Sequence, residues 1–265
     1  LEFFKLIEHR DPQMLSLRKL CWKHAPGKIA ALAGVNALIS YMLNCTGEDY
    51  WREFSEHVSK LNVKIENIKD VVKIVEDFLA NSSCNKLYRD AKKRRLRKLL
   101  TTPIPNRILD ENYFIENPGN YWRTIARAIG SNPSSKTVVF SVKMYYYGLE
   151  ACRSIELTLP MNIPIPVDRR ITQITFYSGL VESNDINRLF RKPRIVRRTW
   201  SLVGELSRIP PIHFDAALWL SAKYYSRNKS LEDSATEISR ELSLDYDKTL
   251  ILLRELFYKL VKEKN

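Results

Sequence analysis

The chain has 265 residues, of which 45% are hydrophobic and 28% charged. That is enough to bury the core of one large domain or of two closely packed ones. A net charge of +13 favours a polyanionic partner. No apolar run approaches the roughly 20 residues of a membrane span, and early charged residues argue against a signal peptide. We therefore expect a globular cytoplasmic protein with no membrane partner.

The four cysteines, Cys21, Cys45, Cys84 and Cys152, lie far apart and form no CxxC pair. Such spacing is not typical of a zinc ribbon or a four-cysteine iron–sulfur loop. We therefore expect reduced thiols in the core, with neither a disulfide nor a metal site.

Few glycines and almost no alternation of polar with apolar residues predict an all-α protein. Asp11-Pro12 is expected to end the first helix and Pro26-Gly27 the second. An almost wholly apolar stretch, 28–43, is expected to form a buried central helix. In chain order, the helical stripes predict helices at 2–9, 14–24, 28–43, 47–58, 61–80, 84–100, 117–130, 169–178, 184–203, 213–226, 230–242 and 246–262, with a central stretch between the seventh and eighth. We expect two helical subdomains flanking a cleft, 25–130 and 1–24 plus 131–265.

Basic residues gather in two segments. Residues 86–98 carry eight basic side chains against one acid, and residues 188–198 carry six with none. This clustering is typical of nucleic-acid binding that weakens steeply with salt; a solvated basic surface is the ordinary alternative. We expect both segments to hold phosphates without reading sequence.

The stretch 136–168 begins with strand-like residues, but their spacing favours a helix. Val138, Val139, Val142, Tyr146 and Leu149 follow one helical stripe, whereas Lys136, Phe140 and Lys143 follow another. Lys136 and Lys143 would then share a face with an aromatic ring between them. A lysine nucleophile needs its free amine, which burial and a neighbouring cation favour. Two solvent-facing lysines on an amphipathic helix are the ordinary alternative, and spacing alone favours it.

A connector with Pro160, Pro164 and Pro166 follows and delivers Asp168 to the start of the next helix. Asp168 is a good N-cap there, and that ordinary role is compatible with a carboxylate held ionised at a helix N-terminus. In the segment 209–225, Asp215 and Trp219 share a helix face. They could read and stack a base, or be a surface Asp above a core Trp.

Five strings, in the order in which they occur along the chain, resemble one family. KTVVFSVKMYYYG, LPMNIPIPVDRR, IPPIHFDAALWLSAK, HRDPQ and NALISYML–GEDYW look like the archaeal 8-oxoguanine DNA glycosylase/lyase branch of the helix–hairpin–helix glycosylase superfamily. The likeness runs from about residue 8 to residue 225. The superfamily's usual LPGVG-type glycine-rich hairpin is missing, and a longer proline-rich hairpin replaces it.

This resemblance implies that Lys136 is the nucleophile and Asp168 the essential carboxylate. Phe140 and Trp219 would sandwich a base flipped out of damaged DNA. The base pocket would be lined by Gln13, Ser40, Trp51, Lys143, Asp215 and the main chain at Pro166. The resemblance implies no metal and no cofactor, and we expect a monomer associated with the nucleoid.

The leading hypothesis is thus excision of 8-oxoguanine through a lysine Schiff base, followed by strand cleavage through β-elimination. One alternative is a non-catalytic helical nucleic-acid-binding protein with 169–225 as a helix-turn-helix region. Another is the same scaffold acting on uracil or an alkylated purine.

Overall fold

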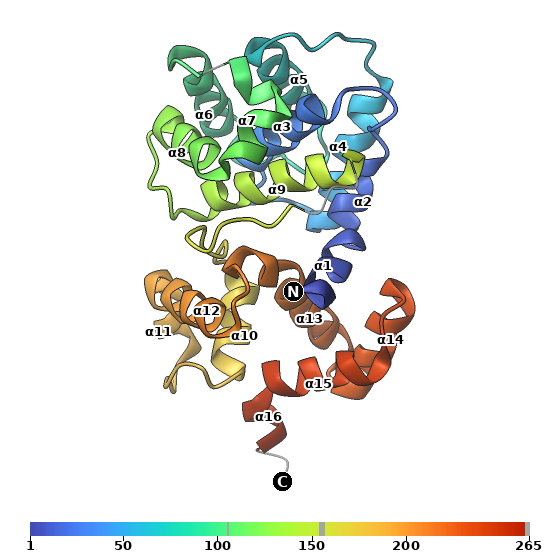
Figure 1. The fold of residues 1–265 in the computed structure, drawn as a ribbon, viewed down its shortest axis with the longest axis vertical. Helices are drawn as coiled ribbons and strands as arrows, with labels where there is room; N and C mark the ends of the chain where they lie inside the picture. Colours follow the sequence, from blue (N-terminus) through green and yellow to red (C-terminus); the bar gives the residue numbers. More distant parts are fainter. Residues whose placement is uncertain (105, 154–156, 263–265) are drawn as a thin grey trace. The chain divides into compact units, whose positions relative to one another are not determined.

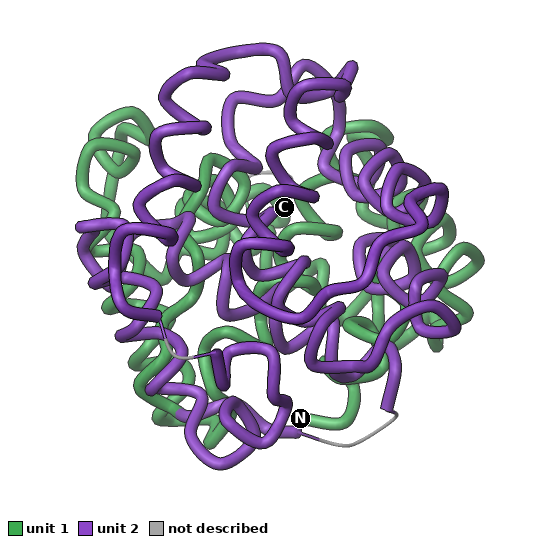
Figure 2. The backbone as a smooth tube through the Cα atoms, turned by 90° about the horizontal axis from the view of Figure 1, so that it is seen from above, with its two compact units in different colours: residues 1–11, 161–265 green, residues 12–160 purple. Residues whose placement is uncertain are grey.

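The structure is a computed structural model that describes residues 1–104, 106–153 and 157–262 (Figure 1). Every regular element among these residues is a helix, which confirms the all-α prediction. The chain packs as two compact units (Figure 2). Unit 1 consists of Leu1–Asp11 and Met161–Asn265, and unit 2 of Pro12–Pro160. No helix of the described ranges is long and apolar enough to cross a membrane.

Unit 2 is built around two helices that lie side by side, α3 and α9 (Figure 1). A Cβ added at Gly148 of α9 would lie 2.6 Å from the Cα of Ala30 in α3, so glycine permits their close approach. The elements of this unit are α2 (Pro12–Arg18), α3 (Pro26–Ala37), α4 (Gly47–Lys60), α5 (Ile68–Asn81), α6 (Arg89–Thr101), the 3-10 turn η1 (Asn106–Leu109), α7 (Glu111–Glu116), α8 (Pro118–Ile129) and α9 (Lys136–Arg153).

Local signals account for several of these boundaries. Asn67 caps α5 and forms a capping box with Asp70. Gly130 ends α8 at φ +61°, a left-handed conformation that glycine adopts without strain. Pro26 corrects a prediction, because it begins α3 instead of breaking a helix. Proline suits the first helical position, where its missing N–H has no partner to lose.

The division into units also differs from the subdomains expected from the sequence. The range 25–130 lies inside unit 2, but α2 and α9 pack there as well, because α9 runs along α3 and α2 packs on α9. The expected central helix is shorter than its apolar stretch, since α3 ends at Ala37. Apolarity alone does not reveal where a buried helix becomes a buried loop.

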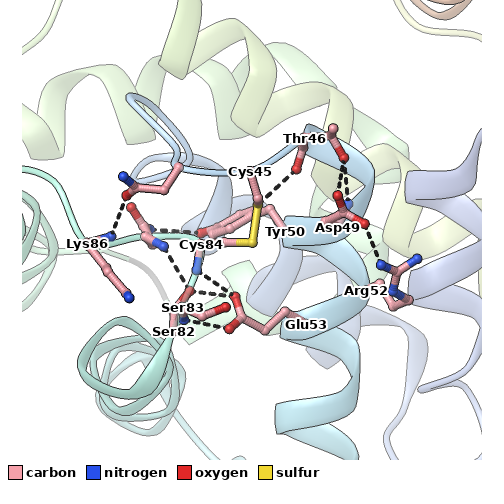
Figure 3. Close-up of a disulfide and its surroundings, with 12 residues drawn as sticks. Cys45, Thr46, Asp49, Tyr50, Arg52, Glu53, Ser82, Ser83, Cys84 and Lys86 are labelled. Carbon is pink, nitrogen blue, oxygen red and sulfur yellow. Dashed lines mark hydrogen bonds and ion pairs between the residues drawn. A yellow bond between two sulfur atoms is a disulfide. The ribbon is translucent and has the colours of Figure 1, made fainter.

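Two disulfides contradict the expectation of reduced thiols. Cys21 bonds to Cys152, and Cys45 bonds to Cys84 (Figure 3 shows the second). The partners are 131 and 39 residues apart, and their Cα atoms approach to 5.1 and 5.2 Å. The spacing of the cysteines in the sequence does not predict these pairs, because only the packing of α2, α4, α5 and α9 brings the cysteines together.

Unit 1 has its own core, to which α1, the segment before α10 and the later helices contribute. A buried pair helps to join its two chain segments: Nδ1 of His213 lies 3.0 Å from Oε1 of Glu8. The predicted helical range 184–203 is divided into two helices, the second of which begins at Pro193. The elements of this unit are α1 (Glu2–His9), α10 (Arg169–Tyr177), α11 (Ile186–Phe190), α12 (Pro193–Ser207), the 3-10 turn η2 (Pro211–Phe214), α13 (Asp215–Asn228), α14 (Leu231–Leu242), α15 (Tyr246–Leu256) and α16 (Tyr258–Lys262).

Candidate active site

The strand-like run after residue 136 is helical, as its spacing predicted. The apolar stripe is wholly buried in unit 2 and consists of Val138, Val139, Val142, Tyr146 and Leu149. Lys136 is the first residue of α9 and is exposed. The structure thus places this amine at the accessible end of a helix whose middle is held in the core.

Lys143 differs sharply from Lys136. Its side chain is 1% exposed, and its Nζ lies 4.8 Å from the centroid of the Tyr147 ring. The alternative in which both lysines face solvent is therefore wrong for Lys143. A buried ammonium is costly unless other groups stabilise it, and an aromatic face is one such group.

Phe140 lies on α9 one turn after Lys136 and is half-buried. Its ring centroid is 6.3 Å from that of Trp51 in α4, at an interplanar angle of 65°. Trp51 is itself 1% exposed and packs edge-on against Tyr50 and Phe54. A rigid aromatic cluster therefore restrains Phe140 close to the candidate nucleophile.

Two polar candidates of unit 2 lie on neighbouring segments. Ser40 follows the end of α3, is half-buried, and donates a hydrogen bond from Oγ to the carbonyl of Ala37 at 2.9 Å. Gln13 lies on α2 and is 5% exposed. Because α2 packs on α9, the helix that carries Gln13 is braced by the helix that carries Lys136.

In unit 1 the proline-rich connector leads into α10. Pro166 is buried, and Asp168 is the N-cap of α10, where its Oδ1 accepts a hydrogen bond from the N–H of Ile171 at 3.0 Å. The N-cap prediction is confirmed. The helix N-terminus stabilises a negative charge at this position, so the capping role and a catalytic role do not compete.

Asp215 is the first residue of α13, and Trp219 lies one turn later. Asp215 is 5% exposed. Trp219 carries a neighbour that the sequence did not suggest: the Arg170 guanidinium lies 4.0 Å from the centroid of its ring. Arginine in the first turn of α10 has the wrong sign for the helix dipole. That conflict was the available signal that Arg170 has a tertiary role.

The two basic segments behave differently. In 188–198 every basic side chain except Arg197 is exposed, but in 86–98 Lys92 is wholly buried and Arg95 is half-buried. The expectation that the first segment lies across the surface as a phosphate-binding strip is wrong for Lys92. Among the described residues, no group of three or more His, Cys, Asp or Glu side chains could hold a metal ion.

The ten candidate residues thus divide between the units. Unit 2 carries Gln13, Ser40, Trp51, Lys136, Phe140 and Lys143, and unit 1 carries Pro166, Asp168, Asp215 and Trp219. Within unit 2 the structure brings Trp51 and Phe140 together. An amine, a carboxylate and flat aromatic rings are the groups that nucleophilic removal of a base needs.

Comparison with known proteins identifies the family of the chain. Residues 1–254 match the family AGOG, described as N-glycosylase/DNA lyase. The N-glycosylase/DNA lyase of Pyrobaculum aerophilum is 31% identical and covers 88% of this chain and 85% of its own; that of Aeropyrum pernix is 30% identical and covers 94% and 87%. The crystal structure of Pa-AGOG, an 8-oxoguanine DNA glycosylase from Pyrobaculum aerophilum complexed with 8-oxoguanosine, aligns with a TM-score of 0.74. That alignment has 29% identity and covers 96% of this chain and 89% of the other.

The fold and the site define a helical DNA glycosylase of the base-excision class. The chain belongs to the AGOG family of N-glycosylase/DNA lyases. It is therefore an enzyme with two activities, release of a base from DNA and cleavage of the strand at the resulting site.

Proposed function

We propose that this enzyme excises 8-oxoguanine and that Lys136 is its nucleophile. The observation that carries the proposal is the position of Lys136: an exposed amine at the first residue of α9, next to the restrained ring of Phe140. The substrate is supported by the likeness to Pa-AGOG, whose structure holds 8-oxoguanosine.

The proposed reaction begins at C1′ of the damaged nucleotide. The neutral Lys136 amine attacks C1′ as the bond from C1′ to the base nitrogen breaks, and the base leaves with that electron pair and takes up a proton. The sugar ring then opens to a Schiff base between Nζ and C1′. Loss of a C2′ proton breaks the C3′–O bond and releases the 3′ phosphate, and hydrolysis of the imine frees the lysine.

Asp168 can take either of two roles in this scheme. It accepts the proton that Lys136 loses, or it stabilises positive charge on the sugar as the base departs. Its position as the N-cap of α10 supports this role, since the hydrogen bond from the Ile171 N–H fixes the carboxylate at the helix end.

The base itself would be held between Phe140 and Trp219, whose rings replace the stacking lost on flipping. Gln13, Ser40, Trp51, Lys143 and Asp215 would line the pocket. The carbonyl of Pro166 would provide selectivity. Guanine oxidised at C8 carries an N7–H that this carbonyl can accept, whereas ordinary guanine would place a lone pair against a buried acceptor.

Borohydride trapping tests the nucleophile. Wild-type enzyme and a duplex with one 8-oxoguanine should give a covalent adduct, and Lys136→Gln should abolish it. Lys98→Gln, at an exposed lysine of α6, is the matched control and should still form the adduct at saturating DNA. If Lys136→Gln formed normal adduct and product, the assignment would be wrong.

Asp168→Asn isolates the carboxylate charge, because asparagine is as good an N-cap as aspartate. The variant should fold and bind DNA but lose most base release. Release at the wild-type rate would leave Asp168 as a cap alone. Duplexes with uracil or an alkylated purine test the alternative substrates, and each should be processed far more slowly.

A non-catalytic nucleic-acid-binding role would predict tight binding to undamaged duplex that survives Lys136→Ala, with no product formed. We further propose that the enzyme acts as a monomer associated with the nucleoid. Size-exclusion chromatography with light scattering tests the oligomeric state, and a single species of 31.0 kDa is expected.

A further inference from the structure

The loop that carries Ser40 is braced along its length. Residues 38–46, here called the Ser40 loop, join α3 to α4. Near its end, the N–H of Asn44 donates to the carbonyl of Cys84 at 2.8 Å, and Cys45 forms its disulfide with Cys84 (Figure 3). Near its start, Nδ2 of Asn85 donates to the carbonyl of Ile39 at 3.2 Å. Both flanks of Ser40 are thus tied to residues 84 and 85.

Residues 82–84 are held in turn by α4. Figure 3 shows Glu53 pointing at this segment, where its carboxylate accepts from the Ser82 hydroxyl at 2.6 Å and the Ser83 N–H at 2.6 Å. Burial alone would raise the pKa of Glu53, but these hydrogen bonds, together with that from the Cys84 N–H, outweigh it and lower the pKa. The support of the Ser40 loop is therefore an ionised, hydrogen-bonded network.

The next residue of the loop, Tyr41, lies beside two cations from α6. Lys92 Nζ is 4.7 Å from the centroid of the Tyr41 ring, and Arg95 Cζ is 5.1 Å from it. Lys92 is wholly buried and also donates to Oδ1 of Asn85. The aromatic ring and the amide oxygen compensate for part of the cost of burying this charge.

Arg95 makes a further connection. Its Nη1 donates to the carbonyl of Leu38 at 3.1 Å and to Oγ1 of Thr137 at 2.9 Å. Leu38 lies two residues before Ser40, and Thr137 directly follows Lys136. A cation beside the first turn of α9 has the wrong sign for the helix dipole, so helix electrostatics does not explain its place. The two hydrogen bonds do.

We propose that Arg95 is a positioning residue: through one guanidinium nitrogen it sets the spacing between Ser40 in the base pocket and Lys136. This inference rests on the proposed function, because it assumes that Lys136 attacks a base held near Ser40. A misplacement of about 1 Å between reacting groups can lower the rate by about a hundredfold. Arginine suits the task, since the two hydrogens of Nη1 point in directions fixed by the guanidinium plane, whereas a lysine ammonium rotates on a flexible stem.

The test is a double-mutant cycle on the single-turnover rate of borohydride trapping at saturating 8-oxoguanine duplex. Arg95→Met should slow trapping about 10- to 100-fold, and Arg95→Lys should recover part of that loss. Thr137→Val removes only the acceptor on the Lys136 side and should slow trapping less. Because both changes break the same hydrogen bond, the double variant should be about as slow as Arg95→Met alone.

Controls separate positioning from DNA binding and from folding. Arg127→Met, at an exposed arginine of α8, should trap at the wild-type rate. Arg94→Met, at the exposed neighbour of Arg95, should lower the salt dependence of DNA affinity, whereas Arg95→Met should not. Thr137→Val changes little volume, so if Arg95→Met folds poorly the trapping rate of Thr137→Val alone tests the hydrogen bond between Arg95 and Thr137, and a wild-type rate would overturn the role.

Three outcomes would overturn the role of Arg95: trapping by Arg95→Met at the wild-type rate, additive effects in the double variant, or a salt slope that falls as it does for Arg94→Met. Failure of the proposed function looks different. In that case the wild-type chain itself forms no adduct, or Lys136→Gln forms a normal one.

Discussion

The two compact units are stabilised in different ways. All four cysteines lie in unit 2, where two disulfides close loops that span 131 and 39 residues. Unit 1 has no cysteine and joins its separate chain segments through noncovalent contacts. These include the buried Glu8–His213 pair and the Arg10 guanidinium, which donates to the carbonyls of Leu242 and Ser243.

This difference bears on the candidate site. The unit that carries Lys136, Ser40 and Phe140 is covalently crosslinked, whereas the unit that carries Asp168 and Trp219 is not. The two units should therefore respond to different stresses: unit 2, which carries Lys136, to reductant, and unit 1, which carries Asp168, to loss of the buried Glu8–His213 contact.

The largest expected effect is on unit 2 when its disulfides are removed. The chain-entropy relation gives about 5 kcal/mol for the Cys21–Cys152 loop and about 4 kcal/mol for the Cys45–Cys84 loop, as upper values. Cys21→Ser/Cys152→Ser and Cys45→Ser/Cys84→Ser should each lower the thermal transition of unit 2 in calorimetry. Reductant should reproduce these shifts in wild type and do nothing to the quadruple variant. An unchanged transition temperature would mean that noncovalent packing alone stabilises unit 2.

The second effect is on unit 1. Glu8→Gln removes the carboxylate that faces His213 in the core of unit 1, and disrupting a buried hydrogen bond in this way costs about 1–3 kcal/mol. The thermal transition of unit 1 should fall, and that of unit 2 should not. Glu2→Gln, at an exposed position of the same helix, is the control and should change neither. If unit 1 of Glu8→Gln unfolded at the wild-type temperature, the Glu8 carboxylate would stabilise the fold no more than a neutral hydrogen bond to His213 does.

A third effect is the pH dependence of unit 2. Burial, followed by the Arg89 charge, lowers the pKa of Lys92 from 10.5 to about 8. Between these values the unfolded chain binds a proton that the folded chain does not, so stability should rise with pH, by at most about 1.4 kcal/mol per unit. Lys92→Met should flatten this rise in denaturant titrations from pH 8 to 10. A rise of equal slope in both proteins would contradict the shift.

The smallest effect concerns DNA affinity and the two basic segments. Arg188 and Arg191 are exposed in unit 1, whereas Lys92 is buried in unit 2. Arg188→Ala/Arg191→Ala should reduce the salt dependence of duplex binding by roughly 0.9 per lost phosphate contact, measured by fluorescence anisotropy. Lys92→Met should leave that slope unchanged. The reverse result would make the buried lysine, not the exposed arginines, the contact.

Much of the local structure was readable from the residues themselves. The stripe from Val138 to Leu149 required a helix despite its strand-like composition, because helix periodicity overrides residue preference when one face is buried. Asp168 is an N-cap as predicted, and Asn67 and Gly130 are caps of equally local origin, since capping depends on neighbours within a few residues. Spacing singled out Lys136, Lys143 and Asp215 among the candidate site residues, but the roles of all ten came from a resemblance in motif order.

Other features depended on contacts between residues far apart in the chain. The pairing of the four cysteines, the burial of Lys92 and Lys143, and the placement of Arg170 over Trp219 all require helices to meet in space. By itself the sequence determined the all-α class, the approximate positions of many helices and the family. Only the tertiary structure decided which charged side chains are buried, which thiols form disulfides and which arginine donates to Thr137. Burial and pairing depend on residues that are close in space but far apart in the sequence, so the sequence order does not reveal them.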